Sequence, residues 1–233
     1  MKTALDNSIE LDPTPLVWTS SQILEIIEDA EEHSYIIDAG CHQGRWKQTM
    51  NYFIGQSVKT IGIDMTDHGC HHMYDFFIEA ALHTVEEERE AFLFAESAVN
   101  SLYDRRDGHC YDAARFFERA GTKKVKTLRL DTVLDSIGNV DEIHYIKIDC
   151  QGNDVNIVKS LGDYAAITNY IQVETTFDDE CAYTVSCNYL DDIEEMEKLG
   201  FRPIFHSPVA PRPDLQGLPA EGEILFINKR LGK

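Results

Sequence analysis

Four acidic residues that could do chemistry stand at the ends of four short apolar runs. They are Asp38, Asp64, Asp149 and Glu174. If the runs are parallel strands, the acids lie at the carboxyl edge of a sheet, which is where open α/β sheets bind their ligands. Carboxylates bind hard cations and accept hydrogen bonds from hydroxyl groups. The spacing therefore predicts a rim built for cations, hydroxyls or both.

The turn after the first run has the pattern D-x-G-x-x-x-G, from Asp38 through Gly40 to Gly44. Glycines let the backbone approach a ligand closely, and Asp38 can meet a positive group. The pattern lacks the G-x-G-x-x-G spacing of a dinucleotide site. Asp64 could accept two ribose hydroxyls, which fits nicotinamide and adenosyl cofactors equally. The plainer alternative is a turn glycine beside a solvated acid.

The elements that must position these residues alternate between strand and helix patterns. A strand over 34–38, a helix over 45–53 and a strand over 59–64 follow one another. This alternation predicts an α/β fold with a parallel sheet and crossover helices. Further strands are expected at 143–149, 169–174, 201–205 and 222–228, and further helices at 23–30, 154–161 and 190–199.

The middle of the chain and its last connection give weaker patterns. Residues 76–82 fit helix or strand by periodicity, but the turn-like run at 86–90 and the apolar run at 91–95 favour a strand hairpin. A short helix over 112–120 and a strand over 125–130 are expected next. The Pro/Gly-rich stretch 207–222 reads as a connector that is too long for a tight hairpin. We expect an N-terminal arm and helix over 1–33, and one α/β domain over 34–233.

The composition disfavours several classes of partner. The 233 residues hold 21 Lys and Arg against 41 Asp and Glu, a net charge of −20. Nucleic acid is disfavoured because like charges would meet. Membrane insertion is not expected, since no stretch approaches the ~20 apolar residues that span a bilayer.

The first residues lack the apolar core of a secretory signal, and the six cysteines lack C-x-x-C spacing. A cytoplasmic protein with free thiols is therefore expected.

Seven segments, in order along the chain, resemble the motifs of FkbM-type methyltransferases. They are YIIDAGCHQGRW, VKTIGID, AFLFAESAVNSLYD, TLRLDTVLDSIG, HYIKIDCQGNDVNIVKSL, YIQVETT and EGEILFINK, and the resemblance covers about residues 34–230. It implies the class I methyltransferase fold: a Rossmann-like, seven-stranded, mostly parallel sheet flanked by helices, with an antiparallel last strand. It also implies S-adenosylmethionine as cofactor. The expected reaction is methyl transfer to a hydroxyl of a sugar, a glycan or a small natural product.

The resemblance also implies roles for individual residues. The first motif would line the methionine end of the cofactor, the end of the second strand its ribose, and the serine of the third motif its adenosine half. The residues expected at the cofactor are Asp38, Gly40, His42, Gly44, Asp64, Met65 and Ser101. This chain departs from the family pattern at His42, where a small or amide residue is usual, and at Gln151 and Asp154, where Glu is usual.

A hydroxyl is a poor nucleophile unless a base takes its proton or a metal lowers its pKa. Asp149 is the first candidate for either role, and His42 is a second candidate base. Asp154 and Glu174 could complete a Mg²⁺ or Ca²⁺ site with Asp149, because hard cations prefer carboxylate oxygens. Alternatively, Asp149 only orients the acceptor and His42 only caps its loop. Lys147 should point to the same side of its strand as Asp149.

A crowded group of His68, Cys70, His71 and His72 looks like a zinc cluster, but residues this close in sequence cannot easily all face one ion. A polar loop over the adenosine site is the simpler interpretation.

Two other classes of function stay open at this stage. One is an NAD(P)-dependent oxidoreductase on a similar sheet, which the missing glycine pattern disfavours. The other is a non-catalytic binding module that keeps the fold. The departures from the family pattern at Gln151 and His42 favour it. A small-molecule or glycan acceptor is the expected partner of the enzyme, and the sequence indicates no oligomeric state.

Overall fold

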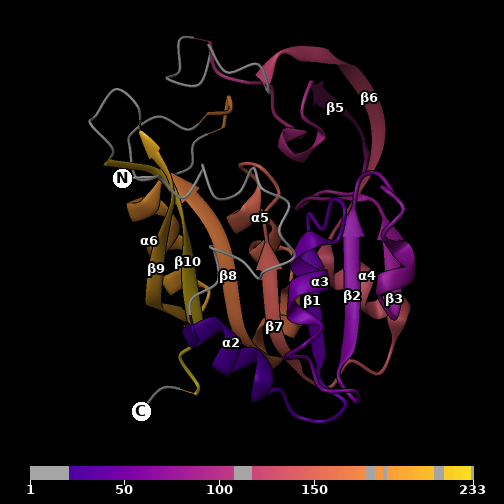
Figure 1. Ribbon diagram of the computed structural model, residues 1–233, viewed down its shortest axis with the longest axis vertical. Helices are drawn as coiled ribbons and strands as arrows, with labels where there is room; N and C mark the ends of the chain where they lie inside the picture. Colours follow the sequence, from indigo (N-terminus) through magenta and orange to yellow (C-terminus); the bar gives the residue numbers. More distant parts are fainter. Residues whose placement is uncertain (1–20, 108–116, 177–181, 186–187, 213–217, 232–233) are drawn as a thin grey trace.

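A seven-stranded sheet is the centre of the computed structural model, which describes residues 21–107, 117–176, 182–185, 188–212 and 218–231. The strand order is β3-β2-β1-β7-β8-β10-β9 (Figure 1). The strands are β1 (Tyr35–Ala39), β2 (Lys59–Asp64), β3 (Phe76–Glu79), β7 (Ile143–Ile148), β8 (Thr168–Thr176), β9 (Phe201–Arg212) and β10 (Leu218–Asn228). Neighbours from β3 to β8 pair in parallel, and β10 runs antiparallel to both β8 and β9. The predicted fold class is confirmed.

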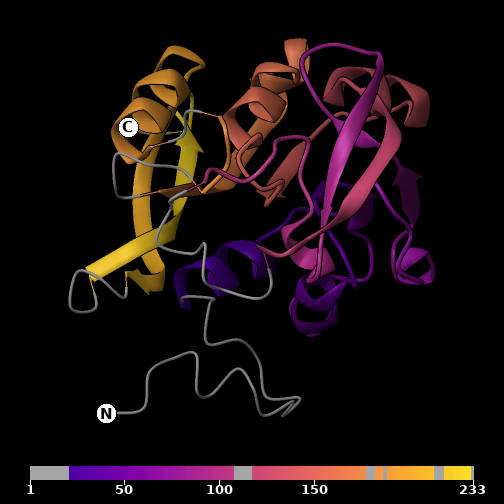
Figure 2. The same cartoon turned by 90° about the horizontal axis from the view of Figure 1, so that it is seen from above.

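Helices cover both faces of this sheet, giving three layers (Figure 2). One face carries α2 (Ser21–Glu28) and α3 (Arg45–Met50), and the other carries α4 (Leu130–Ile137), α5 (Asp154–Lys159) and α6 (Tyr189–Lys198). Short 3-10 turns are η1 (His71–Met73), η2 (Ser97–Val99) and η4 (Gly162–Ile167). No helix in the described part of the chain is long and apolar enough to span a membrane.

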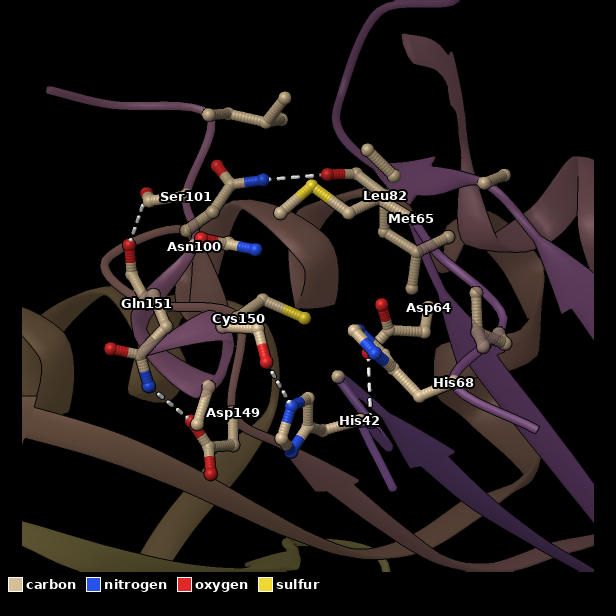
Figure 3. A pocket seen from close by; sticks show the side chains of 18 residues that line it. His42, Asp64, Met65, His68, Leu82, Asn100, Ser101, Asp149, Cys150 and Gln151 are labelled. Atoms are coloured by element: carbon tan, nitrogen blue, oxygen red, sulfur yellow. Dashed lines mark hydrogen bonds between the residues drawn. The ribbon is translucent and has the colours of Figure 1, made fainter. Parts of the chain in front are cut away.

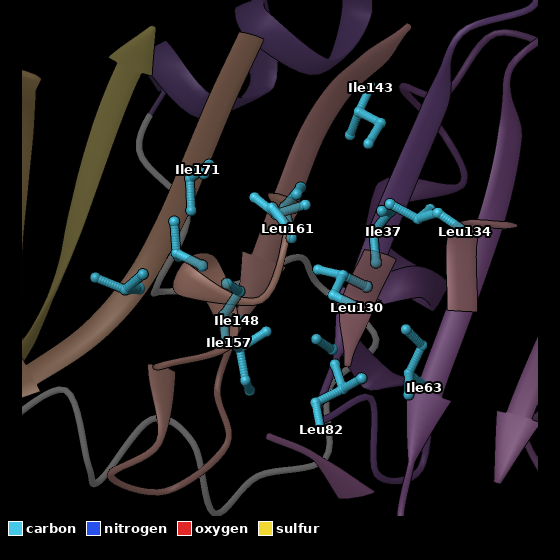
Figure 4. Packing of buried hydrophobic residues seen from close by; sticks show 14 of the residues in the cluster. Ile37, Ile63, Leu82, Leu130, Leu134, Ile143, Ile148, Ile157, Leu161 and Ile171 are labelled. Carbon is cyan, nitrogen blue, oxygen red and sulfur yellow. The ribbon is translucent and has the colours of Figure 1, made fainter. Parts of the chain in front are cut away.

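Alternating residues of each strand divide the core between the two faces. Ile37 packs in the cluster with α4, α5 and α6 (Figure 4), whereas its neighbour Ile36 packs with α2 and α3. The same alternation separates Ile146 from Tyr145. Because both faces are buried, the strands read as continuous apolar runs in the sequence.

A second, three-stranded sheet stands above the carboxyl ends of β1 and β2 (Figure 1). Its order is β4-β6-β5, formed by β4 (Ala81–Leu82), β5 (Glu88–Phe94) and β6 (Arg119–Leu128). The expectation of strand over 76–82 is confirmed, but this run does not form a hairpin with β5. Instead, β5 pairs antiparallel with β6, with an ion pair of 2.7 Å between Lys124 and Glu88 across the strands.

One prediction of local structure is wrong, and another lies mostly outside the described residues. Of the helix expected over 112–120, residues 112–116 are not described, and the last two, Arg119 and Ala120, belong to β6. The connector expected over 207–222 is largely strand, because β9 extends to Arg212 and β10 begins at Leu218. There β9 and β10 pair with each other, and β10 also pairs with β8, a partner that a local pattern does not show.

Candidate functional site

A pocket of about 590 Å³, counted with the space open to solvent, lies at the carboxyl edge of the main sheet (Figure 3). Its wall comes from the loop after β1, the end of β2, β4, the loop that follows η2, and the turn after β7. Its lining mixes apolar and polar side chains, as the lining of small-molecule sites does. Of the cofactor residues predicted from the sequence, the pocket brings together Gly40, His42, Asp64, Met65 and Ser101.

The backbone at Gly40 is in contact with the turn after β7. Gly40 has φ +77°, and a Cβ there would lie 1.9 Å from the carbonyl oxygen of Asp149. Its N–H donates to the carbonyl of Ile63 at 2.9 Å, which joins the loop to the end of β2. Gly44 does not line the pocket. A Cβ at this position would point at Met73 and lie 2.9 Å from its Sδ. The first glycine therefore shapes the pocket, while the second accommodates the start of α3.

Asp38 lies beneath the pocket and does not line it. The Tyr74 hydroxyl donates to its Oδ2 at 2.6 Å, and Lys147 Nζ lies 3.8 Å from its Oδ1. Burial raises the pKa of Asp38, and Lys147 opposes that rise. The carboxylate anchors Lys147, and in this position it does not reach a ligand in the pocket.

Asp64 ends β2 and faces the pocket with an oriented carboxylate. Its Oδ2 accepts the backbone N–H of His42 at 2.8 Å, and its Oδ1 accepts that of Thr66 at 3.0 Å. Burial raises the pKa of Asp64, and the two backbone N–H groups oppose the rise. Each carboxylate oxygen has two lone pairs, so both can still accept a ligand hydroxyl. The geometry suits a diol such as a ribose.

His42 sits at the pocket wall with φ +44°. Its Nε2 lies 2.8 Å from the Ser97 hydroxyl, and its ring meets that of His68 edge-on with centroids 4.5 Å apart. Burial lowers the pKa of His42, and His68 lowers it further. The ring thus joins the loop after β1 to η2 across the pocket. His68 also lines the pocket, while His71 pairs with Asp67 at 2.7 Å.

The Ser101 hydroxyl connects two loops of the wall. It donates to the carbonyl of Gln151 at 2.7 Å and accepts the N–H of Tyr103 at 3.0 Å. Its neighbour Asn100 also lines the pocket, and the sequence analysis missed it. Asn100 Oδ1 accepts the N–H of Phe94 at 2.8 Å, which leaves its amide nitrogen pointing into the pocket (Figure 3). Its place beside Ser101 in the third motif was the available signal.

Asp149 lies where the pocket meets the rest of the carboxyl edge. Its Oδ2 is 3.2 Å from Lys147 Nζ, and its Oδ1 accepts Gln151 Nε2 at 2.6 Å. Lys147 is buried, which would lower its pKa, but Asp149 and Asp38 together outweigh burial and raise it. The lysine is therefore a fixed positive charge beside the Asp149 carboxylate.

Comparison with known proteins decides the family. A model described as the methyltransferase FkbM domain matches residues 38–203. The chain belongs to the FkbM methyltransferase family. The resemblance predicted from the sequence is thus confirmed, and the protein is an S-adenosylmethionine-dependent methyltransferase of the FkbM type.

The chain is also similar, at low sequence identity, to several solved structures. Aeropyrum pernix fibrillarin with bound S-adenosylmethionine is 11% identical over 84% of this chain and 67% of its own, with a TM-score of 0.45. A putative RNA methyltransferase from Pyrococcus horikoshii is 8% identical over 94% and 90%, with a TM-score of 0.44. A putative rRNA methylase from Clostridium thermocellum is 9% identical over 91% and 100%, with a TM-score of 0.42. A search of curated proteins gave no match.

Gln151, one departure from the FkbM pattern, places a neutral amide between two carboxylates. Its Nε2 donates to Asp149 Oδ1 at 2.6 Å and to Glu174 Oε2 at 3.2 Å. Its Oε1 accepts the hydroxyl of Tyr183 at 2.6 Å. Both amide protons and the amide oxygen are engaged, so the side chain is held in this orientation. The amide occupies the position that a bridging cation would need.

The residues predicted as metal ligands do not fit a metal. Asp154 is buried, and its oxygens accept the backbone N–H groups of Cys150 at 3.4 Å and Glu174 at 3.3 Å. Burial raises the pKa of Asp154 to about 7, and the charge of Asp149 adds to the rise. Among the residues that the structure describes, no three His, Cys, Asp or Glu side chains are grouped to hold an ion. We therefore derive no catalytic step through a metal.

Proposed function

We propose that this FkbM methyltransferase transfers a methyl group from S-adenosylmethionine to a hydroxyl oxygen of a small molecule or glycan. The observation that carries the proposal is the pairing of two carboxylates along one edge. Asp64 is oriented by two backbone N–H groups inside the pocket, and Asp149 borders the pocket beside a buried lysine. The first suits a cofactor ribose, and the second suits the proton of an acceptor.

The pocket residues would divide the cofactor between them. Asp64 would accept the ribose hydroxyls, with Met65 beside it, and Asn100 and Ser101 would line the adenosine half. The loop at Gly40 and His42 would face the methionine half. Bound in this way, S-adenosylmethionine supplies an electrophilic methyl group on a sulfonium.

Asp149 would act as the general base. As the acceptor oxygen bonds to the methyl carbon and the carbon–sulfur bond breaks, the hydroxyl proton moves to the Asp149 carboxylate. The ion pair with Lys147, at 3.2 Å, would hold that carboxylate in place for the transfer. The rest of the catalysis is positioning, because in-line transfer depends on the alignment of the two reactants.

A non-catalytic module is the second candidate, and Gln151 is the observation that favours it. Its amide takes up one oxygen of Asp149 and one of Glu174, which leaves fewer free acceptors for chemistry. Such a protein would bind cofactor without turning it over. The oxidoreductase alternative gains no support from the family match.

The test is calorimetric titration of S-adenosylmethionine and S-adenosylhomocysteine into the wild type and into Asp64→Ala. Two hydrogen bonds to a charged group should be lost, so we expect the affinity to fall by roughly 100-fold or more. Asp141→Ala, an exposed acid before β7, makes the same charge change and should bind like the wild type. Thermal melts check that both variants fold.

Absence of binding to the wild type would contradict the methyltransferase proposal. Binding without methyl transfer to a panel of sugars and natural-product alcohols would instead support the non-catalytic module. Added Mg²⁺ should leave the affinity unchanged, because the described acids do not form a metal site.

A further inference from the structure

A line of carboxylates leads away from the cofactor pocket across the carboxyl edge. We name Asp149, Glu174 and Glu223 the acidic row. Gln151 connects Asp149 with Glu174, and Glu174 is directly opposite Glu223 where β8 pairs with β10. Directly opposite residues in an antiparallel pair have side chains close together on one face. The row therefore runs from the pocket wall to the C-terminal strand.

The acidic row lies on the face of the sheet that carries α2 and α3. Lys147 of β7 is the register partner of Asp38 on one side and of Gln172 on the other. Glu174 comes two residues after Gln172, so the two share a face. α2 covers this face at the opposite end of the sheet (Figure 1), where Tyr145 and Leu225 pack against it. The polar ends of β7, β8 and β10 extend beyond that contact.

Over the ranges that the structure describes, the acidic row has too little positive charge around it. Lys147 is the cation placed against it, and its Nζ is directed to Asp149 at 3.2 Å and Asp38 at 3.8 Å. Glu223 Oε2 is buried and has no hydrogen-bond partner among the described residues. A buried carboxylate oxygen without a partner is costly. Burial and its acidic neighbour Asp149 raise the pKa of Glu223 to about 7, against the opposing charge of Lys147.

We propose that the acceptor carries an ammonium group, which Glu223 and Glu174 bind while the hydroxyl to be methylated is presented to Asp149. The proposal rests on the methyltransferase function above and narrows its substrate to amine-bearing alcohols. Amino sugars and amino-alcohol natural products have this chemistry. An ammonium brings both the missing charge and N–H donors for the unpartnered oxygen.

A metal ion suits the same row less well. Magnesium needs oxygen ligands in near-ideal octahedral geometry, and calcium needs six to eight of them. The Gln151 amide separates Asp149 from Glu174, and the described residues hold no three metal-ligating side chains in one group. An ammonium can instead bind two carboxylates that are spaced along the row, because its donors point in different directions.

The test uses ethanolamine as a minimal probe, with ethylene glycol as its neutral match. Each is titrated into the protein saturated with S-adenosylhomocysteine, while NMR follows the side-chain amide signals of Gln151 and Gln172. We expect ethanolamine to shift these signals saturably, with an affinity weakened by about tenfold or more in Glu223→Gln. Glu88→Gln, an exposed acid of β5, is the matched control and should respond like the wild type.

Equal responses to ethanolamine and ethylene glycol, or equal ethanolamine affinity in wild type and Glu223→Gln, would overturn the proposal. So would the absence of any shift by ethanolamine. The binding of S-adenosylhomocysteine is measured first in each protein, so a failure of the methyltransferase function appears separately. The Gln substitution removes a buried charge without changing shape, and retained S-adenosylhomocysteine affinity shows that the variant is folded.

Discussion

The two ends of the site hold their carboxylates in different ways. Asp64 is held by backbone N–H groups from residues 42 and 66. The acidic row is held by side chains, with Lys147 and Gln151 as its main donors. Backbone donors depend on the local path of the chain, whereas side-chain donors change with single substitutions. The proposed cofactor end is therefore fixed by the fold, and the proposed acceptor end can be altered by single substitutions.

The largest effect on stability should come from adding a side chain at Gly40, where the loop after β1 touches the backbone of Asp149. Gly40→Ala places a Cβ 1.9 Å from the backbone oxygen of Asp149, at φ +77°. We expect the free energy of unfolding to fall by more than ~4 kcal/mol, because neither backbone can move aside. Urea denaturation measures this.

Gly69→Ala is the control for Gly40→Ala. Gly69 has φ +84°, but nothing lies within 4 Å of a Cβ there. The backbone strain alone should cost only about 1–2 kcal/mol. Equal losses in the two variants would mean that the close approach to Asp149 does not matter.

The next effect separates chemistry from cofactor binding. Asp149→Asn removes the proposed base, so methyl transfer to a saturating acceptor should slow by about 10²–10⁴-fold. The affinity for S-adenosylhomocysteine should stay within about threefold, because Asp64 is untouched. Release of S-adenosylhomocysteine measures the rate, and calorimetry measures the affinity.

Asp141→Asn, far from the edge, should leave both quantities unchanged. A rate in Asp149→Asn close to that of the wild type would leave Asp149 as an orienting residue only. A loss of cofactor affinity in that variant would mean that the two ends are not separable.

Gln151→Glu adds a further negative charge to the acidic row. The new carboxylate would lie between Asp149 and Glu174, whose own pKa is raised mainly by burial and then by Asp149. The folded-state pKa values of Glu174, Glu223 and Asp154 lie above their unfolded values, mainly because of burial, so the folded protein binds more protons. The variant's stability should therefore fall as the pH rises from about 5 through 7.

We expect a loss of about 1–3 kcal/mol relative to the wild type at about pH 8, and little loss at about pH 5. Urea denaturation across this range gives the profile. Gln56→Glu, on an exposed loop, should show no such slope. A flat profile in Gln151→Glu would show that the row is more solvated than its burial indicates.

The smallest effect should come from the contact across the pocket. Ser97→Ala removes the partner of His42 Nε2. One neutral hydrogen bond contributes about 0.5–1.5 kcal/mol, so the affinity for S-adenosylhomocysteine should fall about threefold to tenfold. Calorimetry at about pH 8 measures it, with Ser136→Ala on α4 as the control. An unchanged affinity would assign the His42–Ser97 bond to the loop alone.

The sequence predicted β1, β2, β7 and β8 because buried parallel strands are continuous apolar runs. For the same reason it placed Asp64 and Asp149 at the edge. It failed at 207–222, where β9 and β10 pair with each other and their prolines and glycines indicated a connector. It also could not show that Tyr74, 36 residues away, covers Asp38.

The bridging role of Gln151 was equally hidden, since it depends on where β8 places Glu174. The sequence showed only that an amide stands where the family usually has an acid. The sequence thus predicted which strand ends carry the acids, and the structure showed which of them line the pocket.

The hydroxyl of Ser101 has a consequence for how the protein folds. Its bond to the Gln151 carbonyl joins residues 50 apart, and the Tyr183 hydroxyl reaches the Val99 carbonyl across 84. Contacts so distant in sequence form only after long loops have closed, which is slow. The pairing of β1 with β7 closes a still longer stretch of chain, from Tyr35 to Ile143, so the pocket wall and the centre of the sheet are both late contacts in folding.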